Sequence, residues 1–472
     1  MHLSYWELFF LDLTVLATCV WMMLRYGKLT VLHPASLYIF FHAYSFTFRL
    51  FQLANGAPTL FETWGLRYLT VSHAEIQRAS LVALATLITM TGVWIYLTSR
   101  STLRSQSPKS PLVYRPFSKR LMWLVVSFTL PAGLIALILL RVPILFGSGD
   151  VFLGGWTNSS YLISIYQWFG VSLLALFYYY GVRPILVLPL IVYLIVGVLS
   201  FSARVMVVVP VLFVLFSYLR RNRLRWRRPG FILAVLATIL VFIPGKGLGS
   251  LLRRGDFVGA RELLVGGLSS LQTGTNIDST FMDMMAVTMT QVDERGRFYY
   301  GGTYSPLLVL PIPRALWPDK PGQSDWRKMI QTPWRPTGQI GAIATVIGEA
   351  YANFGYPGII AYAVILAFLL NSFYGWVLRA PYYSLVNFWS LCIYAILIQV
   401  FRDGLISFVV YHFTILLPLT LIILLHLIAL RRHTGFNRIT TSWYTVFDRS
   451  VAYLNARGRA RYQASGPKPN AP

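Results

Sequence analysis

Residues 304–355 read YSPLLVLPIPRALWPDKPGQSDWRKMIQTPWRPTGQIGAIATVIGEAYANFG, and this stretch is the most informative in the chain. Four closely spaced prolines interrupt it: Pro311, Pro313, Pro318 and Pro321. Because proline fixes φ and lacks a backbone N–H, this part cannot be a continuous helix. It is predicted to be a stiff, kinked loop that holds Arg314, Trp317 and Lys320 in set directions.

The end of the same stretch is predicted to be an apolar helix that carries Glu349 and Asn353. Residues four apart lie on one helix face. A carboxylate inside a membrane helix is costly and usually functional. The stretch therefore predicts fixed cations, an aromatic ring and a buried acid close together. The alternative is a structural re-entrant loop whose charges face water.

The composition indicates a membrane protein. Of the 472 residues 56% are hydrophobic and 12% are charged, whereas a soluble domain has about 25% charged residues. The long apolar runs match membrane spans of about 20 residues, so we expect an all-α polytopic membrane protein with about 11 transmembrane helices. The net charge of +25 would suggest nucleic-acid binding in a soluble protein. Here basic cytoplasmic loops explain it better, and no nucleic-acid partner is expected.

Apolar runs place the spans near residues 5–24, 29–53, 77–98, 121–141, 160–180, 185–201, 203–219, 230–244, 343–377, 384–401 and 406–430. They divide the chain into an N-terminal bundle, a large loop, a C-terminal group of helices and a basic tail, with bounds 1–244, 245–342, 343–430 and 431–472. The bundle has about eight helices and the C-terminal group about three.

Basic residues recur after every second predicted span, as in RRNRLRWRR at Arg220–Arg228. Because Lys and Arg are enriched in cytoplasmic loops, these connections are assigned to the cytoplasm. The N-terminus is then outside and the C-terminus in the cytoplasm, and the loop 245–342 faces outward. This is the topology expected of a multi-pass membrane protein.

The loop 245–342 has eleven basic and eight acidic residues, a balance of +3 on the side where fewer cations are expected. An anionic partner, such as a phosphate or an acidic sugar, fits this surplus. An ordinary solvated loop fits it about as well. Trp317 belongs to a group of indoles that either pack on sugar rings or anchor the loop at the bilayer interface.

Four further residues combine an ionisable side chain with a membrane setting. Arg204 follows the short turn that begins at Ser200, where it either snorkels to lipid or holds a ligand phosphate. Arg402 and Asp403 lie at the end of a span, as functional groups or as a mutual ion pair. His412 is a packing residue or a base. No cluster of carboxylates, His or Cys has metal-ligand spacing, so no metal site is expected.

The segments LPIPRALWPDKPG (Leu310–Gly322) and GEAYANFGYPG (Gly348–Gly358) resemble the bacterial oligosaccharide repeat-unit polymerases, the O-antigen or Wzy-type polymerase family. Together with the residues between them, the motifs span about a tenth of the chain. The resemblance implies a helical glycosyltransferase of the GT-C-like kind that needs neither metal nor cofactor. Such enzymes work at the periplasmic face of the bacterial inner membrane, where they transfer a growing glycan from undecaprenyl diphosphate onto another lipid-linked repeat unit. The N-terminus and the loop 245–342 would then be periplasmic. A chain-length regulator protein is a further partner that the resemblance implies.

Under this mechanism Arg204 and Arg314 would fork onto the leaving diphosphate, and Lys320 would add a point charge. Glu349 is the first candidate for the base, followed by His412 and then Asp403. Asn353, Trp317 and Arg402 would contact the substrate.

Three other functions stay open. A related ligase would transfer the glycan to a lipid A core, and the sequence does not separate it from a polymerase. A transporter of lipid-linked sugar should show internal repeats and broken helices at matching positions, which we do not find in the sequence. A scaffold subunit would leave Glu349 without a task.

Overall fold

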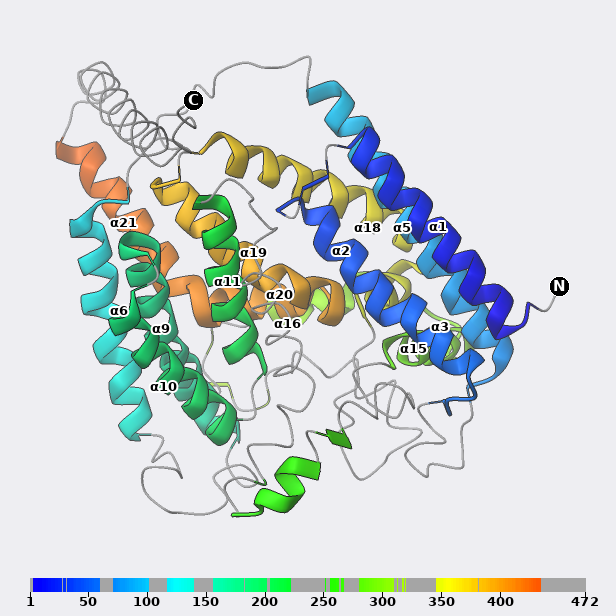
Figure 1. Ribbon diagram of the computed structural model, residues 1–472, viewed down its shortest axis with the longest axis horizontal. Coiled ribbons are helices and arrows are strands. Elements are labelled where there is room, and N and C mark those ends of the chain that lie inside the picture. Colours follow the sequence, from blue (N-terminus) through cyan, green and yellow to red (C-terminus); the bar gives the residue numbers. More distant parts are fainter. Residues whose placement is uncertain are drawn as a thin grey trace, which may run out of the picture. The chain divides into compact units, whose positions relative to one another are not determined.

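The computed structural model describes residues 3–59, 71–101, 117–139, 156–221, 280–309 and 345–433, apart from positions 28, 31, 182, 202, 203 and 381, and shorter pieces between 251 and 319. All the regular elements of these residues are helices (Figure 1). The predicted all-α class is therefore confirmed for the described part of the chain.

Four described helices are long and apolar enough to cross a membrane: Tyr5–Arg25, His73–Arg100, Lys119–Leu139 and Thr345–Gly375. They support a helical membrane protein. The number of about 11 spans stays a prediction. The expected span at 230–244 and most of the tail 431–472 lie outside the described residues.

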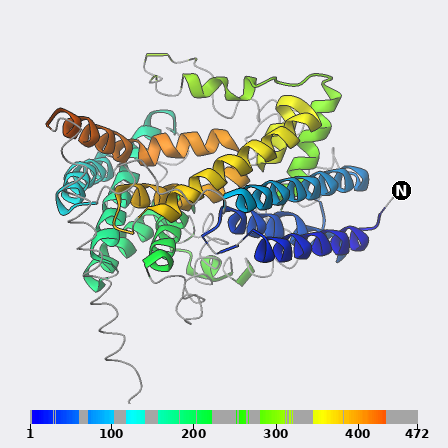
Figure 2. The ribbon, with the colours of Figure 1, turned by 90° about the horizontal axis from the view of Figure 1, so that it is seen from above.

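The N-terminal helices are α1 (Tyr5–Arg25), α2 (Pro34–His42), the π-helical turn η1 (Ala43–Thr47), α3 (Phe48–Ala54) and α5 (His73–Ser101). A capping box begins α1, because Ser4 Oγ accepts the Glu7 N–H and the Glu7 carboxylate accepts the Ser4 N–H. Ser72 and Glu75 form the same box at α5. Figure 2 shows α1, α2 and α5 side by side, and α1 packs on both α3 and α5.

The next helices are α6 (Lys119–Leu139), α9 (Trp156–Tyr180), α10 (Pro184–Phe201) and α11 (Arg204–Arg221). Gly133 lets α6 and α9 approach closely, since a Cβ at this position would lie 2.6 Å from the Cβ of Phe169. α10 ends at Phe201 and α11 begins at Arg204, and the two helices pack against each other.

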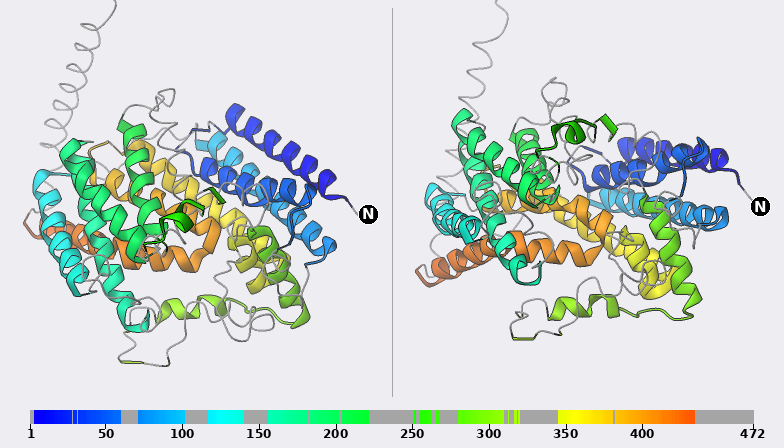
Figure 3. Two further views of the ribbon diagram at one scale, coloured as in Figure 1. Left: turned by 60° about the horizontal axis from the view of Figure 1, so that its bottom comes forward. Right: turned by 90° about the horizontal axis from the view of Figure 1, so that it is seen from below.

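One helix of the predicted large loop packs against the membrane helices. It is α15 (Phe281–Glu294), and it contacts both α5 and α18 (Figure 3). Met282, Met284, Met285 and Met289 are buried on it. Methionine fills irregular apolar gaps well, which suits a short helix wedged between longer ones. A 3-10 turn, η3 (Gly302–Tyr304), and α16 (Ser305–Leu308) follow.

The helix α18 (Thr345–Arg379) is kinked at Gly355, whose φ of 65° and ψ of −150° are not helical. A side chain at this position would be strained, and its Cβ would lie 2.8 Å from the ring of Phe298. Pro357 follows and cannot donate a helical hydrogen bond. The kink separates a first segment that carries Glu349 and Asn353 from a longer apolar segment.

The last helices are α19 (Leu385–Asp403), α20 (Leu405–Tyr411), the π-helical turn η4 (His412–Leu416) and α21 (Leu417–His433). The chain divides into two units, Met1–Pro418 and Leu419–Pro472. Every site described below belongs to the first unit.

Within this unit the helix ends form two sets. One set is joined by Arg49 with Asp283, Arg78 with Asp293, and Arg402 with Phe281. The other is joined by Thr30 with Tyr374, Phe117 with Tyr383, and Arg220 with Ala380. Which set faces the periplasm stays a prediction.

Candidate functional site

The carboxylate of Glu349 is completely buried in the first segment of α18. Its Oε2 accepts a hydrogen bond of 2.7 Å from the backbone N–H of Leu405, the first residue of α20. The first N–H groups of a helix lack partners within the helix and carry its positive dipole end. We call this position of the carboxylate, at the backbone N–H of Leu405, the seat of Glu349. Backbone dipoles favour negative charge there, and the hydrogen bond fixes the orientation of the carboxylate.

Gly404 makes this seat possible. Its φ of 90° lies in a region that residues with a side chain avoid. A Cβ on Gly404 would lie 2.1 Å from Glu349 Oε2, well inside contact distance. Glycine is thus required here both by the backbone and by the position of the carboxylate.

Asn353 lies one turn after Glu349 on α18 and is also completely buried, so the two share a face as predicted. Its amide joins α18 to the turn before α16. The oxygen accepts the Gly301 N–H at 2.9 Å, and the nitrogen donates to Thr303 Oγ1 at 2.8 Å and to the Glu349 carbonyl at 2.9 Å. Through these contacts Asn353 holds the turn at residues 299–304 against α18. Its predicted contact with a sugar hydroxyl stays untested.

The same turn carries Tyr304, which lies close enough to Glu349 to feel its charge. Burial, followed by the negative charge of Glu349, raises the pKa of Tyr304 above its ordinary value, and a bond with Asn353 partly offsets this. The phenol therefore keeps its proton at neutral pH and can donate a hydrogen bond. Tyr362, on the second segment of α18, is also within electrostatic reach of Glu349.

Arg402 and Asp403 form the mutual ion pair that the sequence left open, with 3.5 Å between Arg402 Nε and Asp403 Oδ1. Arg402 also donates to Gln399 at 3.3 Å and lies 5.6 Å from the ring centre of Phe281 on α15. Because Asp403 directly precedes Gly404, this pair adjoins the seat of Glu349. The structure therefore brings together Glu349, Asn353, Arg402 and Asp403.

A completely buried ion pair, which the sequence analysis missed, joins α3 to α15. Arg49 donates to both carboxylate oxygens of Asp283, at 3.2 Å from Nε and 2.5 Å from Nη2. Neither side chain is exposed. Arg49 Nη2 also donates to the Pro58 carbonyl at 2.7 Å. The missed signal is Arg49 itself, an ionisable residue inside a predicted span.

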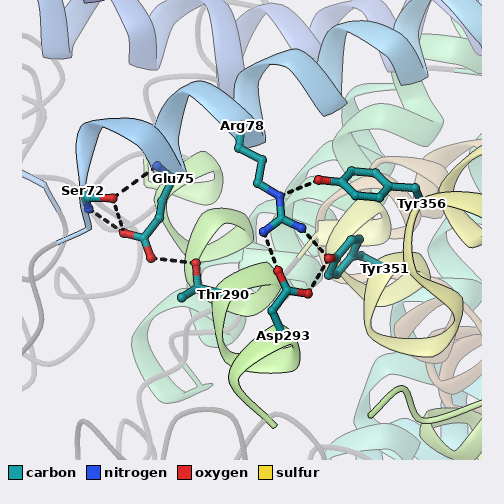
Figure 4. A network of polar contacts seen from close by, with 7 residues as sticks. All are labelled: Ser72, Glu75, Arg78, Thr290, Asp293, Tyr351 and Tyr356. Atoms are coloured by element: carbon teal, nitrogen blue, oxygen red, sulfur yellow. Dashed lines mark hydrogen bonds and ion pairs between the residues drawn. The ribbon is translucent and has the colours of Figure 1, made fainter. Parts of the chain in front are cut away.

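A second, half-exposed network joins α5, α15 and α18 (Figure 4). Arg78 donates to Asp293 at 2.5 Å, to the Tyr356 hydroxyl at 2.6 Å and to the Tyr351 hydroxyl. Tyr351 in turn donates to Asp293 at 2.6 Å. The network fixes the first segment of α18, which also carries Glu349.

A further buried polar group links α1 to the π-helical turn η1. Asp12 accepts from Thr47 and lies 3.1 Å from His42 Nε2, with all three residues buried. π-helical turns often mark functional sites, although they also relieve local strain. The contacts described for this group link α1, α2 and η1, so we treat it as part of the scaffold.

The remaining predicted site residues are only partly described. Trp317 is half exposed. His412 begins η4 and packs edge-on against Trp389, with ring centres 6.1 Å apart. Arg204 begins α11, but its side chain lies outside the described residues, as do Arg314 and Lys320. The described residues therefore include the acidic part of the site. The binding of a diphosphate by Arg204, Arg314 and Lys320 stays a prediction.

No group of three or more His, Cys, Asp or Glu side chains placed to hold a metal ion occurs among the described residues. Cys19 and Cys392 are both free and buried. Comparison of the chain with family models, with curated proteins and with solved structures finds no match.

Proposed function

We propose that the chain is a repeat-unit polymerase, which transfers a glycan from undecaprenyl diphosphate to a second lipid-linked glycan at the periplasmic face of a bacterial inner membrane. The observation that carries the proposal is the seat of Glu349. A membrane helix that follows the motif LPIPRALWPDKPG holds a buried carboxylate, fixed by the Leu405 N–H. Membrane proteins rarely bury a carboxylate in this way without a task for it.

In the proposed reaction an acceptor hydroxyl attacks the anomeric carbon of the donor. The bond between that carbon and the diphosphate oxygen breaks, and the diphosphate leaves with the electron pair. The hydroxyl proton passes to a carboxylate, for which Glu349 is our first assignment. A base must lie within hydrogen-bond reach of the proton that it takes, and the Leu405 N–H supports this by holding Glu349 in one orientation.

The leaving diphosphate needs cations that are in place before the substrate arrives. We assign this role to Arg204 and Arg314, with Lys320 as a further point charge. The finer GT-C-like architecture belongs to this proposal, as does the absence of a metal requirement. A lipid diphosphate is already an activated donor, so the transfer needs no nucleotide.

Neighbouring groups support this assignment by their placement. The pair of Arg402 and Asp403 borders the seat of Glu349, and Asn353 holds the turn that carries Tyr304. We propose that the Tyr304 hydroxyl orients the acceptor hydroxyl by donating a hydrogen bond to it. His412 and Asp403 remain the next candidates for the base.

Reconstitution of the purified protein with undecaprenyl-diphosphate-linked repeat units tests the proposal. We expect a ladder of lengthened glycans that persists in EDTA. A single transfer to a lipid A core acceptor would instead identify a ligase. If the substrate crosses the membrane and no new glycosidic bond forms, the chain is a transporter. If neither glycan transfer nor movement occurs, a scaffold role remains.

A further inference from the structure

A groove of about 490 Å³ runs along one face of α5 beside the network of Figure 4. Its polar end is formed by Gln77, Arg78 and Tyr356, and its apolar end by Leu81, Val82 and Ala85. Positions 77, 81 and 85 are successive turns apart on one helix face. The groove is thus polar where α5 begins and apolar further along the helix.

This order of polarity matches the edge of a bilayer. The groove starts in the first turns of His73–Arg100, a helix long and apolar enough to span a membrane. Leu81 and Ile88, one and three turns beyond Gln77, are among the exposed apolar side chains of α5. A headgroup at Arg78 would therefore continue into acyl chains along an apolar surface.

One cation, Arg78, lines the polar end, and the carboxylate of Asp293 adjoins it through the ion pair. The side chain of Arg78 is 31% exposed and that of Asp293 is 41% exposed. A guanidinium has five N–H donors, and the described contacts of Arg78 use three of them. Glu75 lies one turn before Arg78 and accepts from Thr290 at 2.6 Å. Two carboxylates close to the lining cation make this end unfavourable for a headgroup with only negative charge.

We propose that the groove binds a phospholipid whose headgroup joins a phosphate to a primary ammonium, such as phosphatidylethanolamine. The phosphate accepts hydrogen bonds from Arg78, and the ammonium lies against Asp293. The acyl chains follow Leu81 and Ala85 along α5. The proposal does not depend on glycan transfer, because it uses none of the residues assigned to that reaction.

A second groove provides a matched control. It has a volume of about 570 Å³ on α1 and is lined by Leu13, Thr14, Ala17, Thr18 and Trp21, with no charged side chain among them. The exposed residues Ala85 and Ala17 occupy comparable places in the two grooves. Ala85→Trp fills the charged groove and Ala17→Trp fills the uncharged one, while neither touches the network around Arg78.

Native mass spectrometry of the detergent-purified chain, titrated with dioleoyl phosphatidylethanolamine and with dioleoyl phosphatidylglycerol, tests the proposal. We expect the first lipid to bind at least about tenfold more tightly, the difference that one charge-assisted hydrogen bond supplies. Ala85→Trp should remove this preference, and Ala17→Trp should keep it. Arg78→Gln should weaken phosphatidylethanolamine by about tenfold if the variant folds.

Three results would overturn the proposal. These are equal binding of the two lipids, an unchanged preference in Ala85→Trp, and an equal loss in Ala85→Trp and Ala17→Trp. The last result would show that the lipid adheres to apolar surface in general. Because the two Trp variants leave Arg78 intact, the test holds even where Arg78→Gln does not fold.

Discussion

The two ion pairs that fasten α15 use the same residue types in opposite surroundings. Arg49 with Asp283 is completely buried, whereas Arg78 with Asp293 is 31% and 41% exposed. Asp283 lies in the first turn of α15, where the helix dipole favours an acid, and Asp293 lies in the last turn, where it does not. A buried pair therefore fixes one end of the helix, and a solvated network fixes the other.

The difference teaches that two ion pairs with the same N–O distance can stabilise the fold by different amounts. Breaking a buried pair leaves an uncompensated charge in a medium of low dielectric, which costs several kcal/mol. Water replaces a lost partner at an exposed site, so an exposed pair contributes little. The described contacts of α15 thus predict an uneven response to matched substitutions at its two ends.

The largest effect on stability is expected from Asp283→Ala, because it leaves the buried Arg49 cation without its carboxylate partner and without access to water. We expect a loss of about 3–5 kcal/mol in the free energy of unfolding. Asp293→Ala is the matched control, with an expected loss of about 1 kcal/mol or less. Unfolding in mixed detergent micelles, followed by circular dichroism, measures both. Equal losses would contradict the comparison.

Replacing the whole buried pair by apolar residues sharpens the same point. Arg49→Met with Asp283→Leu removes both charges together, so no charge is left alone. We expect the double variant to recover most of the stability that Asp283→Ala loses, since apolar replacements of buried pairs are often neutral. A double variant as unstable as Asp283→Ala would show that the pair has a role beyond charge balance.

Gly404→Ala tests the position of a further buried acid, Glu349, whose carboxylate accepts a hydrogen bond from the backbone N–H of Leu405. The φ of 90° at Gly404 makes any side chain costly, by about 1–3 kcal/mol. The new Cβ would also push Glu349 Oε2 out of its seat. We expect a moderate loss of stability and a much larger loss of polymerisation, measured on the same preparation. Unchanged polymerisation would show that the seat is not needed.

The smallest effect on stability is expected from the double variant Arg78→Asp with Asp293→Arg, in which the two residues of the exposed pair change places. Both charges can still meet in solvent, so we expect a loss of about 1 kcal/mol or less. The guanidinium then lies on α15 rather than beside Tyr351 and Tyr356, which removes their bonds to it. A loss as large as that of Asp283→Ala would show that the tyrosines, and not the ion pair, fasten this end.

The sequence predicted the helices well where hydropathy alone decides them, as in α1, α5 and α6. It also predicted that Glu349 and Asn353 share a face, because that follows from helical spacing. It could not predict the pair of Arg49 and Asp283, which are 234 residues apart, since only tertiary packing brings them together. The requirement for Gly404 was hidden for the same reason: it depends on where Glu349 lies.

The same limit applies to the expected interplay of Arg314 and Glu349. The sequence places a proline-stiffened cation before a buried acid. The structure describes a contact of that acid with α20, and Arg314 lies outside the described residues. Arg314→Lys keeps the charge and loses the planar fork, so we expect it to lower polymerisation by about 10²–10³. Full activity in this variant would remove Arg314 from the assigned cations.

Glu349→Gln in the reconstituted polymerisation assay tests the proposed function most directly. The amide keeps the shape of the side chain and can still accept the Leu405 N–H, but it cannot take a proton. We expect normal folding and normal substrate binding, with the glycan ladder formed about 10²–10⁴ times more slowly. A ladder formed at the rate of the unchanged chain would contradict the account, and would pass the role of base to His412 or Asp403.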